Sequence, residues 1–123
     1  MNWELLYEFA QNIGKPQWGK NEEIDKWIPE CFVSLYQEYD PLEVELPFEG
    51  NSLNMIPYKE LDSYLGEYGL DKKSLIFATC NGDPYFMNDS KIYTFVHGVE
   101  NPSWELLNES VKEFFMTIIN DGT

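Results

Sequence analysis

The chain has 123 residues, of which 43% are hydrophobic and 16% aromatic, and its formal net charge is −14. This length and apolar content predict one globular domain spanning residues 1–123 rather than a disordered chain. All eight basic residues are lysines, and without the planar fork of arginine we do not expect direct binding to nucleic acid. An acidic surface instead favours basic protein partners, although acidity alone does not name one.

The predicted location is cytoplasmic, with no attachment to a membrane. No apolar run approaches the roughly 18 residues that a membrane span needs. The segment "MNWELLYEFAQ" is acidic where a signal peptide would be basic, and it lacks a cleavage-site pattern. A cytoplasmic chain keeps its thiols reduced, and neither Cys31 nor Cys80 belongs to a Cys-x-x-Cys motif. Both stand in apolar segments, so we expect free, buried cysteines.

Two helices are predicted in the first 40 residues. The first covers residues 2–14 and ends at Gly14, with apolar residues at helical spacing: Trp3, Leu6, Ala10 and Ile13. The second covers residues 29–40, because Pro29 suits a first helical position and Pro41 prevents continuation. Its expected buried face consists of Phe32, Leu35, Tyr36 and Tyr39.

Residues 42–48, "LEVELPF", are predicted to form a half-buried strand. Strand geometry puts alternate side chains on opposite faces, and here apolar and polar positions alternate: Leu42, Val44 and Leu46 against Glu43, Glu45 and Pro47. A turn and a short extended piece are expected over residues 50–57. The next helix is predicted over residues 58–69, with Gly69 as its stop.

The segment "ATCNGDPYFMND", residues 78–89, raises three possibilities: a metal loop, a catalytic turn or a corner between strands. We predict a corner within an antiparallel meander over residues 74–97, with turns near Asn81-Gly82 and Asn88-Asp89. An Asn-Gly pair favours a type I′ turn, because both central residues of that turn need positive φ. His97 is expected to close the last strand and to make a structural hydrogen bond.

The last helix has two possible starts. "SVKE", residues 110–113, has the form of a capping box in which Ser110 is the N-cap and Glu113 reaches back. A longer helix beginning near Ser103 is the alternative, because Trp104, Leu107 and Val111 also keep helical spacing. We prefer the shorter helix.

Catalytic, cofactor and metal sites are not expected. A calcium loop of the EF-hand type needs oxygen ligands at alternate positions, where residues 81–89 place proline and apolar side chains. His97 is the only histidine, and neither Gly-x-Ser-x-Gly nor a glycine-rich phosphate loop is present. We therefore predict a protein that is not an enzyme and needs no cofactor or metal.

Several segments, taken in order, resemble the core of the SUKH superfamily, which includes fungal regulators of cell-wall synthesis and bacterial immunity proteins. "SLIFATCNGDPYFM" resembles its apolar strand and corner, "KIYTFVHG" its next strand, and "NESVKEFF" the start of its C-terminal helix. "IPECFVSLYQEYD" resembles its early helix, so the resemblance covers residues 28–119. It implies an α+β fold in which an antiparallel sheet with a central meander packs against N-terminal and C-terminal helices. It also implies no catalysis, since bacterial members bind and neutralise a cognate toxin, often a nuclease.

The predicted function is that of a non-catalytic immunity protein whose partner is a basic, nuclease-type toxin encoded nearby. One alternative is a regulatory interaction domain with a host-protein partner and no toxin. The other is an enzyme with an unrecognised site. The candidate contact residues are five acids expected on exposed strand faces or corners: Glu43, Glu45, Glu49, Asp83 and Asp89.

Overall fold

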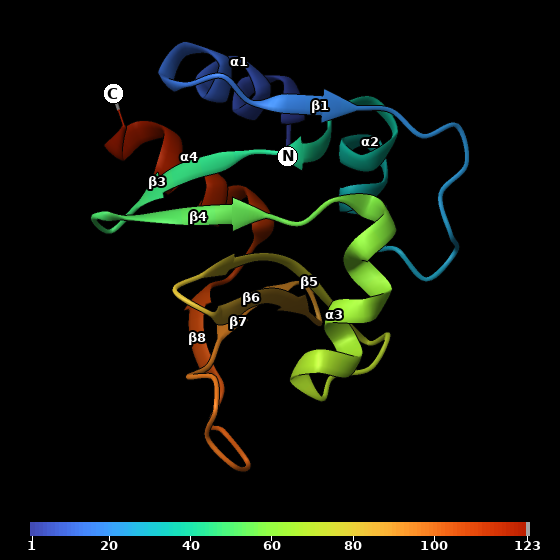
Figure 1. The fold of residues 1–123 in the computed structure, drawn as a ribbon, viewed down its shortest axis with the longest axis vertical. Coiled ribbons are helices and arrows are strands. Elements are labelled where there is room, and N and C mark those ends of the chain that lie inside the picture. The colour runs from blue at the N-terminus through green and yellow to red at the C-terminus, as the bar shows by residue number, and fades with distance from the viewer. Residues whose placement is uncertain (123) are drawn as a thin grey trace.

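The computed structural model describes residues 1–122, which form an α+β fold (Figure 1). The helices are α1 (Trp3–Ile13), α2 (Glu30–Glu38), α3 (Leu61–Tyr68) and α4 (Val111–Asp121), with the 3₁₀ helix η1 (Tyr58–Glu60) directly before α3. The strands are β1 (Gln17–Gly19), β2 (Asp40–Glu43), β3 (Glu45–Phe48), β4 (Asn51–Met55), β5 (Ser74–Cys80), β6 (Asp83–Asn88), β7 (Lys91–Thr94) and β8 (Glu105–Asn108). Within residues 1–122, no helix is long and apolar enough to cross a membrane.

The main sheet is an antiparallel meander of six strands in the order β3-β4-β5-β6-β7-β8, whereas β1 and β2 pair separately. The predicted meander is confirmed, although β7 ends at Thr94 rather than at His97. Its first corner has φ angles of 51° at Asn81 and 85° at Gly82, the two positive values that a type I′ turn needs. The second corner turns at Asp89 and Ser90, one residue later than predicted.

The hairpin of β3 and β4 joins the rest of the sheet along a short seam. The β4–β5 register has two pairs, Asn54↔Thr79 and Met55↔Ala78, whereas β5 and β6 pair along their whole length. One further backbone bond runs from the Ile56 N–H to the Phe77 carbonyl at 2.9 Å. The hairpin and the strands β5 to β8 are therefore two parts of one sheet with few bonds between them.

The prediction of one strand over residues 42–48 is wrong, because β2 and β3 are separate strands. The chain changes partner at Val44, because β2 pairs with β1 and β3 pairs with β4. Val44 and Leu46 are buried as expected, but 43% of Leu42 is exposed. Leu42 lies instead over Gly19, where an added Cβ would come within 3.0 Å of the Leu42 Cδ1. Alternation thus identified the extended backbone but not its two separate pairings.

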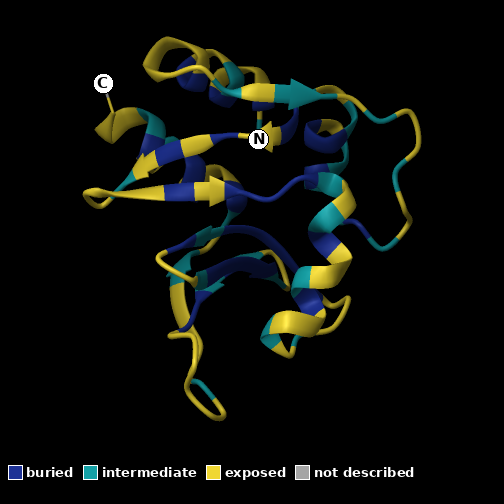
Figure 2. Cartoon of the chain, in the orientation of Figure 1, coloured by how far each residue is buried: buried dark blue, intermediate teal, exposed yellow. Residues whose placement is uncertain are grey.

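The core lies between the sheet and the helices α1, α2 and α4, with Phe77 of β5 at its centre. The Phe77 ring lies 5.5 Å from that of Phe32 in α2 and 5.4 Å from those of Phe114 and Phe115 in α4. Successive strand residues face opposite sides. Tyr85 therefore contacts Phe114 of α4, whereas its neighbour Phe86 contacts Phe95, whose ring meets that of Tyr68 in α3. Figure 2 shows β5 and β6 buried in this arrangement, and the loop between β7 and β8 exposed.

The helix ends follow from local capping and differ in places from the prediction. Ser110 caps α4 by accepting the Glu113 N–H at 3.1 Å, and the Glu113 carboxylate reaches back to the Glu109 N–H. The longer helix from Ser103 is wrong, because Glu105–Asn108 pair with β7 as β8. Gly69 ends α3 with φ 69°, as predicted.

The first two helices differ slightly from their predicted extents and faces. The helix α1 ends at Ile13, which is 46% exposed rather than part of the buried face, because it lies in the last turn beyond Phe9 and Ala10. The helix α2 follows Pro29 and ends at Glu38, where the Tyr39 N–H donates to the Leu35 carbonyl at 2.7 Å. These are changes of one or two residues at helix ends, where boundaries are least well determined by sequence.

Candidate functional site

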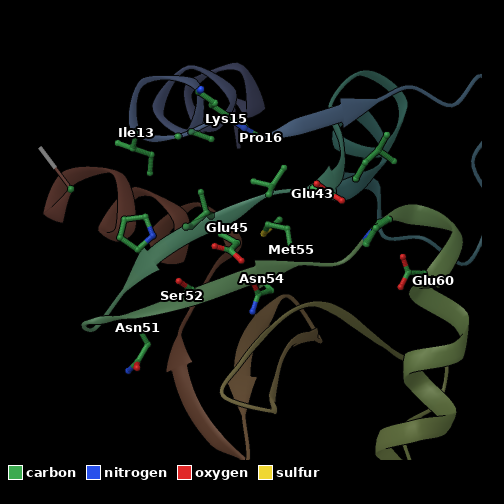
Figure 3. A pocket seen from close by; sticks show the side chains of 18 of the residues that line it. Ile13, Lys15, Pro16, Glu43, Glu45, Asn51, Ser52, Asn54, Met55 and Glu60 are labelled. Carbon is green, nitrogen blue, oxygen red and sulfur yellow. The ribbon is translucent and has the colours of Figure 1, made fainter.

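An open groove of about 930 Å³ lies between the end of α1, the strands β2 to β4 and the start of α3 (Figure 3). We call it the acidic groove. Its walls come from four parts of the chain: residues 10–16, residues 42–47, residues 51–57 and residues 60–64, with Gly122 at its rim. Because these segments are distant in sequence, the groove exists only once the hairpin β3–β4 is folded beside α1.

Carboxylates dominate the charge of the groove. Glu43, Glu45 and Glu60 line it, and Lys15 is its one basic residue. The ion pairs found among residues 1–122 join Lys72 to Asp62, Lys91 to Glu109 and His97 to Asp83, so none involves the groove. Its three carboxylates are therefore available to a cationic ligand.

Strand pairing explains why Glu45 faces the groove. In the β3–β4 register Glu45 lies opposite Asn54, and Leu46 lies opposite Leu53. Leu46 and Leu53 are almost fully buried, so the other face of the hairpin carries Glu45 and Asn54 into solvent. Glu43 ends β2 and is also exposed. Glu43 and Glu45, two of the candidate contact residues, therefore both line the groove.

The groove also has an apolar component that the sequence patterns misplaced. Ile13 and Leu42 line it and are 46% and 43% exposed. Both were assigned to buried faces, since their spacing matched the core residues around them. Glu60 and Lys15 were missed altogether, because nothing local to either residue indicates a shared site. A surface with apolar and acidic side chains together can supply both affinity and charge selectivity.

The other three predicted acids lie elsewhere. Glu49, at the turn of β3 and β4, and Asp83, at the first meander corner, lie at the same end of the sheet. Burial raises the pKa of the Cys80 thiol between them, and the carboxylates of Asp83 and Glu49 raise it further. Asp89 is exposed at the opposite corner, between β6 and β7. The five candidates therefore occupy three places, not one surface.

Asp83 is less available than predicted, because His97 occupies it. Its Oδ1 accepts the His97 backbone N–H at 3.0 Å and lies 2.6 Å from the His97 Nδ1. The imidazole lies over Gly82, where an added Cβ would be 2.9 Å from the His97 Cε1. The predicted structural hydrogen bond of His97 is confirmed. It ties the chain after β7 to the first meander corner.

Two further observations concern metal ligands and the cysteine thiols. Within residues 1–122, no group of three His, Cys, Asp or Glu side chains could hold a metal ion. Burial raises the pKa of the Cys31 thiol as it does that of Cys80, which disfavours the reactive thiolate. In comparisons with known proteins, no family model and no curated protein matches the chain.

Proposed function

We propose that this protein is a non-catalytic immunity protein that binds and neutralises a basic toxin of the nuclease type. The observation that carries the proposal is the acidic groove, with three carboxylates and one lysine on a chain of net charge −14. A nuclease presents a cationic surface to its nucleic acid, so an acidic groove is complementary to it. The resemblance of residues 28–119 to the SUKH superfamily supports the same function.

The finer architecture is part of this proposal. A SUKH-like domain over residues 1–123 is consistent with a meander flanked by α1 and α4, in the order that the resemblance implies. A toxin that acts inside the producing cell would have to be met in the cytoplasm, so the proposal includes that location. No catalytic step is needed, since occupying the toxin's substrate surface is sufficient to neutralise it.

Charge and apolar contact have separate roles in the proposed complex. Complementary charge raises association rates by about 10- to 1,000-fold, an effect that salt reduces because charges are screened beyond about 8 Å at physiological ionic strength. Affinity depends more on a small, well-packed apolar centre. In the groove, Glu43 and Glu45 provide the charge, and the half-exposed Ile13 and Leu42 provide apolar area.

The test is co-expression with the toxin encoded beside the gene, scored as survival, together with association kinetics of the purified pair. The variant Glu43→Lys/Glu45→Lys reverses the charge of two side chains in the groove. We expect its association rate to fall about tenfold at low salt, with the difference shrinking at high salt. The matched control is Glu22→Lys/Glu23→Lys, which makes the same change in net charge on an exposed loop outside the groove.

Three results are informative beyond the expected one. If the association rate falls by the same factor in both double variants, net charge rather than the groove controls binding. If the groove variant protects as well as the parent at every salt concentration, the groove is not the interface. If the parent protects against no neighbouring toxin, the alternative function, a regulatory domain that binds a host protein, replaces the proposed one.

A further inference from the structure

The exposed apolar side chains are concentrated in two places. Seven large hydrophobic residues are exposed within residues 1–122, and two of them, Ile13 and Leu42, line the acidic groove. Four others fall between residues 96 and 106: Val96, Val99, Trp104 and Leu106, with exposures of 62%, 53%, 44% and 47%. Single exposed apolar residues need no explanation, but a cluster of them marks an interaction surface.

Leu106 lies on β8, an outer strand of the sheet, and Trp104 directly precedes it, whereas Val96 and Val99 lie in the loop that joins β7 to β8. Figure 1 shows β8 at one side of the sheet with the loop from β7 extending beyond it, and among residues 1–122 its one strand neighbour is β7. Trp104 is held by two ring contacts, at 4.9 Å to Phe86 and 5.5 Å to Tyr93. A large aromatic side chain that is fixed by the core and half exposed is a suitable anchor for a partner.

The two outer strands of the sheet differ in how they are protected. The strand β3 contains Pro47, which cannot donate a backbone hydrogen bond, whereas α4 packs near both outer strands. The strand β8 has the sequence Glu-Leu-Leu-Asn, with neither proline nor lysine. A proline on an outer strand prevents pairing, so β3 lacks one backbone donor whereas β8 keeps all of its backbone N–H groups. Because its register with β7 shifts near Ile92, the length that can pair is short.

Charge indicates what kind of partner fits. Glu100 and Glu105 are exposed around the apolar cluster, and the nearby Lys91 is already 3.7 Å from the Glu109 carboxylate. A second copy of the chain would bring a further net charge of −14 to an already acidic surface, which opposes self-association. A segment that alternates basic and apolar side chains would satisfy both features.

We infer that this surface, Val96, Val99, Trp104 and Leu106 with Glu100 and Glu105, is a second docking surface that takes an extended basic segment of a protein partner alongside β8. We call it the β8 surface. Apolar side chains of the segment contact Trp104 and Leu106, and its lysine or arginine side chains face Glu105 and Glu100. The inference rests on the proposed function in one respect, the basic character of the partner, and it does not require that partner to be a toxin.

The test uses the intact protein and a synthetic peptide of about ten residues in which lysine alternates with valine or isoleucine. Binding is measured by calorimetry, and its position by backbone amide shifts in NMR spectra. We expect shifts centred on residues 104–108 and weak or no binding of the same peptide with glutamate in place of lysine. Leu106→Lys and Glu105→Lys should each weaken binding by at least about tenfold.

Two controls make the same substitutions elsewhere. Leu5 on α1 is 42% exposed, nearly as much as Leu106, so Leu5→Lys tests whether replacing any exposed leucine weakens binding. Glu22 is also exposed, so Glu22→Lys tests whether reversing any exposed carboxylate weakens binding. Both should change the dissociation constant by less than about twofold. The amide spectrum of each variant verifies its fold, and Glu105→Lys retains the test if Leu106→Lys does not fold.

Several outcomes would overturn the inference. One is equal binding of the acidic peptide, and another is a set of amide shifts centred on residues 42–47 of the acidic groove. A third is a dimer in sedimentation experiments that Leu106→Lys dissociates, which would make a second copy the occupant. Failure of the proposed function is a separate result, since loss of protection in the survival assay leaves peptide binding at β8 unchanged.

Discussion

Replacing Asp40 with asparagine should destabilise the protein, because two donors share its carboxylate and an amide can accept from one of them. Asp40, at the start of β2, is 5% exposed. Its Oδ1 accepts the Tyr58 backbone N–H at 2.9 Å, and its Oδ2 accepts from the Asn21 Nδ2 at 2.9 Å. The same Asn21 Nδ2 donates to the Tyr36 carbonyl at 2.8 Å. The carboxylate therefore joins the loop before α2, the strand β2 and the start of η1.

The magnitude follows from the number of hydrogen bonds lost. A hydrogen bond to a charged group contributes about 1.5–3 kcal/mol to stability. In Asp40→Asn the new NH₂ group faces a donor whichever way the amide turns, so one of the two bonds is lost. We expect a loss of about 2 kcal/mol in the free energy of unfolding. Asp40→Ala removes both acceptors and leaves the partly buried Tyr58 N–H without its partner, so its cost should approach about 4 kcal/mol.

The assay is urea denaturation followed by circular dichroism, in which a stability change moves the midpoint and leaves the slope unaltered. Asp89→Asn is the matched control. It is the same chemical change at an exposed turn residue with φ 49°, a conformation that asparagine tolerates, and it should cost less than about 0.5 kcal/mol. Equal midpoints for Asp40→Asn and the parent would refute the role assigned to this carboxylate, as would an equal loss in both variants.

Three further predictions concern single features. Ser110→Ala should lower stability by about 1 kcal/mol without preventing folding, as denaturant titration will show, because the alanine cannot accept the N–H at the start of α4. Gly82→Ala should lower the free energy of unfolding by at least about 1 kcal/mol, since φ is 85° and the new Cβ meets the His97 ring. Its control is Gly14→Ala, which lies in extended backbone with open space around it and should change the stability little. Both cysteines should react slowly with a thiol reagent in the native state at pH 8, because a raised thiol pKa leaves less thiolate at a given pH. Their reaction should become faster as the pH rises past 9.0, the ordinary pKa of a cysteine thiol. Native reaction as fast as that of the urea-unfolded protein would contradict this.

Local signals predicted the elements well where each signal acts within a few residues. The Asn81-Gly82 corner and the Ser110 cap depend on φ preferences and on one side-chain hydrogen bond, and both occur as predicted. The strand β8 was missed, because Trp104 and Leu107 keep a spacing that also fits a helix. What decides between the two is pairing with β7, a contact that the periodicity of one segment does not contain.

The acidic groove could be predicted in part only. Alternation identified Glu43 and Glu45 as solvent-facing, and both line the groove. Lys15 and Glu60 reach it from a loop and a helix boundary far away in sequence, so no local pattern connects them. Asp83 was expected to be free at its corner, but the chain after β7 folds back and places His97 on it. Contacts between residues that are distant in sequence arise from tertiary packing, so local sequence patterns do not predict them.

The two faces of the β3–β4 hairpin have a consequence for how the surface of this protein can change during evolution. One wall of the acidic groove stands on the β3–β4 hairpin, whose inward residues Leu46 and Leu53 belong to the core while Glu45 and Asn54 face solvent. Substitutions at the outward positions change the charge and shape of the groove without disturbing the aromatic packing around Phe77. Partner preference can therefore be altered on this hairpin by a few surface changes, while the scaffold that displays them keeps its stability.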